Sequence, residues 1–140
     1  MRRWPSIPAL PGVDVALAGV VMPAVDPSLA ADDATRDAVR HIMWARVSLL
    51  RDVDGLSRAL AELRALAGAR PTDPETANML FLAQAITAAA LARRESRGGH
   101  FRSDYPERDP LLDGRHSLVA GRSTAAAADV PEEGAVYAAR

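Results

Sequence analysis

The residue types best suited to chemistry lie in one short segment, residues 94–106, which combines charged side chains, two glycines, a histidine and a Tyr-Pro pair. We expect Glu95 to pair with Arg97, and Asp104 with Arg102, because the planar guanidinium group binds a carboxylate through two hydrogen bonds. Such a cluster could recognise a dicarboxylate anion. The alternative, which we favour, is structural: the pairs fix the loop against a neighbouring domain.

Other residue types with chemical potential do not form a recognisable site. The histidines (His41, His100 and His116) lack the spacing of a zinc site, and the chain has no cysteine. We interpret His41 as a helix-surface residue and His100 as a hydrogen-bonded residue that organises a turn. Trp44 is interpreted as a packing residue. Without a Gly-x-Gly-x-x-Gly turn after a strand or a Gly-x-Ser-x-Gly elbow, the sequence assigns no catalytic, cofactor-binding or metal-binding residue.

Composition narrows the function classes further. The chain has 140 residues, which suits one domain, and a formal net charge of −1, which gives no electrostatic case for nucleic acid or an anionic membrane. It has no lysine, which excludes Schiff-base chemistry and a P-loop lysine. Residues 15–25 loosely resemble a signal peptide, but Pro23 interrupts the run. The longest apolar run, 79–92, is shorter than the ~20 residues of a membrane span. We therefore predict a cytoplasmic protein that does not enter a membrane.

Apolar periodicity predicts three helices. The first begins near Asp32 or Asp33 and extends to about residue 51, and the second covers roughly 55–67, with Asp54 as a possible cap. The third begins either with a Thr72–Glu75 capping box or with Asp73 as cap and proline at the first helical position, and it ends by the glycines at 98 and 99.

These helices predict an all-α fold, a spectrin-like, up-down-up three-helix bundle over residues 32–109. The proline-rich residues 1–31 are expected to form an irregular lead-in, and residues 110–140 a loosely packed tail. The third helix is apolar on almost every side from 79 to 92, which is more surface than two short neighbours can cover. This excess indicates a partner outside the bundle.

The charged segment also resembles a known family. It is similar to the C-terminal signature of the succinate dehydrogenase/fumarate reductase flavoprotein superfamily at Glu95, Ser96, Arg97, Gly98, His100, Arg102, Asp104, Tyr105 and Pro106. The stretches 42–44 and 47–56 resemble the first helix and turn of that family's helical domain, although Ser48 stands where glycine is usual. Within the superfamily, Trp44 and the amino-acid sequence of residues 98–106 most resemble the L-aspartate oxidase family.

The resemblance implies an FAD-dependent enzyme that oxidises L-aspartate to iminoaspartate in NAD biosynthesis. It also implies that the flavin site and catalytic residues lie in two other domains, to which no residue here corresponds. We therefore expect a C-terminal part, from a split gene or a truncated reading frame, that lacks activity without its partner, the flavin-binding domain. The signature loop is expected near that junction. The alternatives are the end of a fumarate reductase or succinate dehydrogenase flavoprotein, and a stand-alone helical interaction module.

Overall fold

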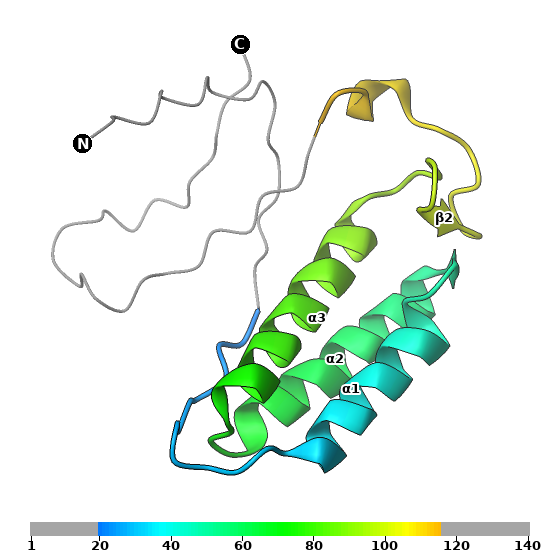
Figure 1. Cartoon of the computed structure of the whole chain (residues 1–140). Helices are drawn as coiled ribbons and strands as arrows, with labels where there is room; N and C mark the ends of the chain where they lie inside the picture. Colours follow the sequence, from blue (N-terminus) through cyan, green and yellow to red (C-terminus); the bar gives the residue numbers. More distant parts are fainter. Residues whose placement is uncertain (1–19, 116–140) are drawn as a thin grey trace, which may run out of the picture.

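Three antiparallel helices form the body of the molecule in the computed structural model, which describes residues 20–115 (Figure 1). Helix α1 spans Asp33–Arg46, α2 spans Val53–Ala69 and α3 spans Pro74–Ala92. The chain passes up, down and up again, so that α2 lies antiparallel to its two neighbours. The protein is thus an all-α three-helix bundle, as the sequence predicts.

Each helix begins at an aspartate whose side chain accepts a hydrogen bond from the backbone three residues later. The caps Asp32, Asp52 and Asp73 bind the N–H groups of Thr35, Gly55 and Thr76. A cap of this kind satisfies one of the N–H groups that a first helical turn leaves without a partner. Of the two predicted starts of the third helix, Asp73 as cap with proline at the first helical position is confirmed, and the Thr72–Glu75 capping box is wrong. The predicted cap of the second helix was wrong by two residues, because Asp52 takes the place expected for Asp54.

The first and third helices end earlier than their apolar patterns indicate. Helix α1 ends at Arg46, with Val47 as its C-cap, instead of continuing to residue 51. The chain leaves the helix because Leu50–Arg51 forms strand β1, which pairs in parallel with strand β2, Phe101–Arg102. Helix α3 ends at Ala92, well before the glycines. A short 3₁₀ helix, η1, covers Pro110–Leu112.

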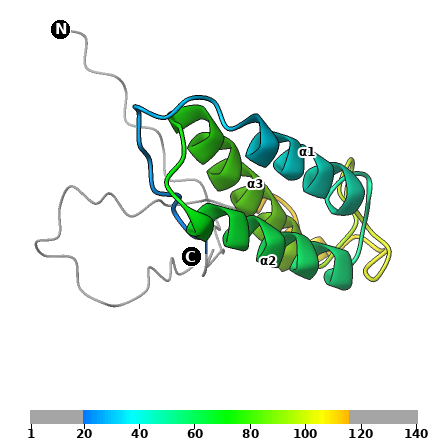
Figure 2. The ribbon, with the colours of Figure 1, turned by 90° about the horizontal axis from the view of Figure 1, so that it is seen from below.

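The core lies between the three helices, and the most extensive contact joins α2 to α3. All three pairs of helices are in contact, and Figure 2 shows the bundle from below. The buried cluster consists of Val39, Ile42, Val47, Leu56, Ala59, Leu63, Ala67, Leu80, Ala83 and Ala90. Leucines from α2 and alanines from α3 meet in it, and the small alanine side chains let the two helices approach closely.

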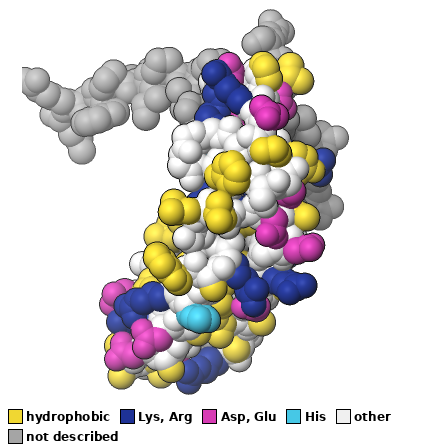
Figure 3. All heavy atoms as spheres, turned by 90° about the vertical axis from the view of Figure 1, so that its right-hand side faces the viewer, with side chains coloured by type: hydrophobic (Ala, Val, Ile, Leu, Met, Phe, Trp, Pro, Cys, Tyr) yellow, Lys and Arg dark blue, Asp and Glu magenta, His cyan; other side chains and the backbone are white. Residues whose placement is uncertain are grey.

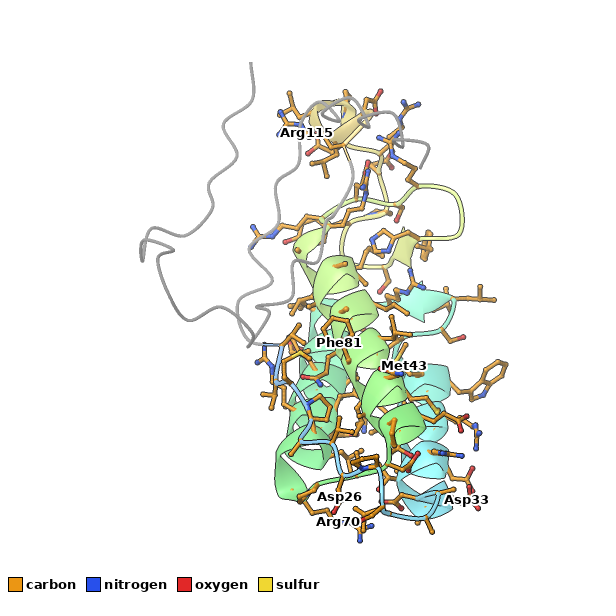
Figure 4. The ribbon with its side chains drawn as sticks, turned by 60° about the vertical axis from the view of Figure 1, so that its left-hand side comes forward. Asp26, Asp33, Met43, Arg70, Phe81 and Arg115 are labelled. Atoms are coloured by element: carbon orange, nitrogen blue, oxygen red, sulfur yellow. The ribbon has the colours of Figure 1, made fainter. Side chains whose placement is uncertain are left out.

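The lead-in segment covers part of α3. The side chain of Gln84 is fully buried, accepts a hydrogen bond from the Val21 N–H at 2.9 Å and donates one to the Val21 carbonyl at 3.0 Å. Thr72 exchanges backbone hydrogen bonds with residues 24 and 26. Figure 4 shows Asp26, Asp33 and Arg70 at this end of the bundle and Arg115 at the other. Some of the excess apolar surface of α3 is thus covered from within, while Leu82 and Ile86 stay 56% and 51% exposed.

The described helices are packing elements of this bundle. Neither α3 nor any other helix of residues 20–115 has the length and apolar content of a bilayer-spanning segment. The remainder of the predicted lead-in, residues 1–19, and most of the predicted tail, residues 116–140, lie outside the part of the chain that the structure describes.

Candidate functional site

The charged segment folds into a compact loop across the upper end of α3, beside β1 (Figure 1). Leu50 pairs with Phe101 and Arg51 with Arg102, and the Ser103 N–H donates to the Arg51 carbonyl at 2.8 Å. The pairing brings together residues that are about fifty positions apart in sequence. All eight predicted signature residues belong to this loop: Glu95, Ser96, Arg97, Gly98, His100, Arg102, Asp104 and Tyr105.

Arg102 is the centre of the loop, with its side chain 1% exposed. Its Nη1 atom donates to the carbonyls of Ala90, Leu91 and Arg93 at 2.9, 3.1 and 3.3 Å. The last carbonyls of a helix have no partner within the helix, and a cation is favoured there by the helix dipole. The guanidinium therefore terminates α3, which explains why the helix ends before the glycines.

The other edge of the Arg102 guanidinium binds Asp104. The Nε and Nη2 atoms donate to the two carboxylate oxygens at 2.7 and 2.6 Å, and this pairing lowers the pKa of Asp104 to about 2. The same carboxylate accepts the Val53 N–H at 3.0 Å, at the start of α2. The Tyr105 ring lies 5.1 Å from the guanidinium carbon, within the range of a cation–π contact. Arg102 and Asp104 thus link two helix ends, confirming the predicted pair.

Glu95 forms a second buried cluster. Its side chain is fully buried and accepts hydrogen bonds from Arg97 Nε at 3.0 Å, Arg93 Nε at 2.7 Å and the Asp109 N–H at 2.9 Å. The hydrogen bonds from Arg97 are the main reason why the pKa of Glu95 falls to about 2. A carboxylate with this low pKa stays ionised at neutral pH, and both of its oxygens already accept hydrogen bonds from the loop. Glu95 therefore holds the loop together and is unsuited to proton transfer.

Arg97 extends this cluster towards the following residues. Its side chain is 31% exposed, and it donates to the Asp113 carboxylate and, at 3.3 Å, to the Asp109 carbonyl. Arg108 also binds Asp113. The first residues of the predicted loose tail, 110–115, are therefore held against the loop by ion pairs and include η1.

His100 is neutral in this arrangement. Its Nδ1 atom lies 2.8 Å from Arg51 Nη1, and its Nε2 atom lies 3.2 Å from the Arg93 carbonyl. Because arginine only donates and a carbonyl only accepts, the ring proton must be on Nε2. Burial, together with the charges of Arg51, Arg102 and Arg93, lowers the pKa of His100 below its usual value. The residue organises the turn, as the sequence indicates.

The low pKa of His100 predicts a specific dependence of stability on pH. The unfolded chain binds a proton at this residue more readily than the folded chain, so the contribution is complete above about pH 6.5 and declines as the pH falls below it. We expect the free energy of unfolding, measured with urea, to fall between pH 7.5 and 5.5, and His100→Gln to reduce that fall. His41→Gln, at an exposed position on α1, is the control. An unchanged pH dependence in His100→Gln would contradict the interpretation.

Gly98 gives the loop its tight turn. The backbone groups of Arg97 and His100 exchange hydrogen bonds of 2.7 and 2.9 Å, and Gly98 between them has φ +56°. A residue with a side chain costs about 1–2 kcal/mol in this left-handed region. We expect Gly98→Ala to lower the free energy of unfolding by about that amount, measured with urea. Gly99→Ala is the matched control, because a Cβ atom there meets no atom within 4 Å and its φ is not positive.

The Ser96 side chain also forms hydrogen bonds within the loop. Its hydroxyl donates to the Tyr105 carbonyl at 2.8 Å and accepts the Arg102 N–H at 2.9 Å. Both contacts hold the two sides of the loop together. The Ser96 hydroxyl thus donates one hydrogen bond and accepts another within the loop, which indicates a structural role.

The loop is a closed ion-pair structure. Arg93, Arg97 and Arg102 all bind carboxylates of the loop itself, which favours a structural role within this chain over dicarboxylate recognition, and the predicted contact of these pairs with a neighbouring domain stays a prediction. Among residues 20–115 no three potential ligands gather as a metal site. The paired glycines of the loop follow a helix and precede a two-residue strand, so they do not form the strand–glycine turn–helix unit that holds a dinucleotide.

Two features of this region differ from the sequence interpretation. Trp44 was expected to pack, but it is 79% exposed, because the core-facing stripe of α1 carries Val39, Ile42 and Met43 and leaves Trp44 on the opposite side. The roles of Arg93, Asp109 and Asp113 were missed. For Arg93 a signal existed, since it stands two residues before Glu95, the same separation as Arg97 on the other side.

Comparison with known proteins places these residues in context. Residues 69–133 match the family model described as fumarate reductase flavoprotein C-term. The chain is 52% identical over 96 residues to an L-aspartate oxidase of Rhodospirillum rubrum, covering 68% of this chain and 34% of that protein. It is 41% identical over 90 residues to an L-aspartate oxidase of Caulobacter vibrioides, covering 59% of this chain and 17% of that protein.

A relative with a different name is similar as well. One polypeptide of the fumarate reductase (CoM/CoB) of Methanothermobacter marburgensis is 33% identical over 103 residues, covering 62% of this chain and 18% of that polypeptide. The matched region thus spans about a third or less of the length of each of these relatives.

Proposed function

We propose that this chain, which belongs to the succinate dehydrogenase/fumarate reductase flavoprotein superfamily as a C-terminal helical domain, supplies that domain to an FAD-dependent L-aspartate oxidase. The observation that carries the proposal is the 52% and 41% identity to relatives named L-aspartate oxidase. In the proposed reaction L-aspartate is oxidised to iminoaspartate, for NAD biosynthesis in the cytoplasm. FAD, when bound, accepts the two electrons.

The role of the described residues in this enzyme is structural. The glycines of the loop do not form a dinucleotide-binding turn, and the charges of the loop bind one another, so the flavin-binding domain of the enzyme is the proposed partner. The loop supplies a rigid end to the bundle. Arg102 terminates α3, and Asp104 joins the loop to the start of α2. A rigid domain of this kind can position a neighbouring domain without touching the substrate.

The end of a fumarate reductase flavoprotein is the second candidate. Two observations favour it: the description of the matching family model, and the 33% identity to the Methanothermobacter marburgensis polypeptide. The two candidates differ in the domain that this chain must fit. They can be separated by asking which relative accepts the chain in place of its own C-terminal region.

The test uses two full-length chimaeras. The matched region of the Caulobacter vibrioides oxidase is replaced by its counterpart from this chain, and the same is done with the Methanothermobacter marburgensis polypeptide. Bound FAD is measured by absorbance, and aspartate-dependent peroxide formation is measured for the Caulobacter chimaera. We expect that chimaera to retain FAD and activity and the other to lose FAD. The opposite pattern would favour the fumarate reductase candidate, and loss of FAD from both would favour an independent helical module.

A further inference from the structure

Large apolar side chains are exposed at the loop end of the bundle, on residues from α1, the connection to β1, β1 itself, the start of α2 and β2. We call this set the loop-end apolar face: Trp44 (79% exposed), Leu49 (73%), Leu50 (77%), Val53 (48%) and Phe101 (41%). Figure 3, which views the molecule from the right-hand side of Figure 1, shows hydrophobic side chains between charged groups along its length. Exposed apolar residues scattered singly are ordinary, but a group at one end indicates a contact surface.

The backbone beneath this face is held by hydrogen bonds. Leu50 is paired with Phe101 in the parallel β1–β2 ladder, so the two side chains project to the same side of it. Next to Leu50, the carbonyl of Arg51 accepts the Ser103 N–H at 2.8 Å. The Val53 N–H is bound to Asp104 at 3.0 Å. Because these bonds already order the chain, little conformational freedom remains to be lost when a partner binds.

The two charged residues that follow Leu50 and Phe101 in sequence are directed inwards. Arg51 binds His100 and the Val47 carbonyl, and Arg102 binds Asp104 and the end of α3. The apolar side chains next to them in sequence project outwards instead. Tryptophan and phenylalanine are enriched at the centre of protein interfaces, and the charged groups Arg46, Asp52, Asp54 and Arg58 border Leu50, as at the rim of an interface. The chemistry therefore favours a large apolar protein surface as the partner.

We infer that the loop-end apolar face is the surface on which the flavin-binding part of the same enzyme docks; this inference rests on the proposed function. The matched region is 17% of the Caulobacter vibrioides relative, and the family model is described as a C-terminal one, so most of such a protein lies before it. The competing surface is the α3 pair of Leu82 and Ile86, which is less exposed and lies on the helix that the lead-in contacts through Gln84.

The test compares matched double variants in the Caulobacter vibrioides chimaera. Trp44→Ser with Leu50→Ser alters the loop-end apolar face, and Leu82→Ser with Ile86→Ser removes two large apolar side chains from α3. The melting temperature is followed by the fluorescence of released FAD. We expect the first pair to lower it by at least about 5 °C and the second pair to change it by less than about 2 °C. In the 140-residue chain alone, both pairs should leave the helical circular dichroism and its melting nearly unchanged, because the residues are exposed.

The other possible outcomes contradict either the assigned face or the proposed function. If the α3 pair lowers the melting temperature as much as the loop-end pair or more, or if neither pair lowers it, the assigned face is wrong. The proposed function is not contradicted in that case, provided that the parent chimaera oxidises aspartate. A parent chimaera without FAD contradicts the proposed function itself. If the chain alone dimerises in light scattering and only the loop-end pair abolishes this, with no effect in the chimaera, the face binds a second copy and the inference is wrong.

Discussion

Replacing Arg102 with alanine is expected to lower the free energy of unfolding by about 3–5 kcal/mol, the cost of removing one partner from a buried ion pair. Arg102 is 1% exposed, and its loss leaves Asp104 without its cation. It also leaves the carbonyls of Ala90 and Leu91, at the end of α3, without the donor that satisfies them. The measurement is urea unfolding of the 140-residue chain followed by circular dichroism.

Arg108→Ala is the matched control for this prediction. Arg108 binds Asp113 through two nitrogens, as Arg102 binds Asp104, but its side chain is 60% exposed. An exposed pair contributes about 0–1 kcal/mol, because water solvates both charges when they separate. Equal losses in the two variants would mean that burial does not determine the strength of these pairs, and the role assigned to Arg102 would be wrong.

Glu95→Gln is expected to have the second largest effect, a loss of about 3 kcal/mol at pH 7. Glutamine has nearly the same shape but no charge, so the partly buried guanidinium groups of Arg93 and Arg97 lose their shared anion. The matched control is Glu107→Gln, at an exposed position of the same loop, for which we expect a change within about 0.5 kcal/mol.

The same variant also tests the acid stability of the chain. The pKa of Glu95 is about 2, below its ordinary 4.5, so its contribution is complete above about pH 4.5 and is lost as the pH falls towards 2. We therefore expect the difference in unfolding free energy between the parent chain and Glu95→Gln to shrink from pH 5 to pH 2.5. A constant difference over that range would show that the charge of Glu95 does not cause the stabilisation.

Much of the fold follows from local sequence. An aspartate cap and the N–H group it binds are three residues apart, so Asp73 followed by Pro74 marks the start of α3 without reference to the rest of the chain. The pairs Glu95–Arg97 and Arg102–Asp104 were predictable for the same reason, since each joins residues two positions apart.

The remaining features depend on contacts between distant residues. The end of α1 was misplaced because Leu50 pairs with Phe101, and no local pattern reports a partner about fifty residues away. Helix α3 ends where the guanidinium of Arg102 meets its last carbonyls, a contact that exists only after the loop has folded back.

Sequence alone thus determined the three helices, the approximate positions where they begin and the short-range ion pairs, because these depend on spacings of two to four residues. The tertiary structure decided where α1 and α3 stop, the neutral state of His100 between Arg51 and the end of α3, and the exposure of Trp44. These features depend on which residues distant in sequence are buried together away from water, and only the packing of the bundle determines which residues those are.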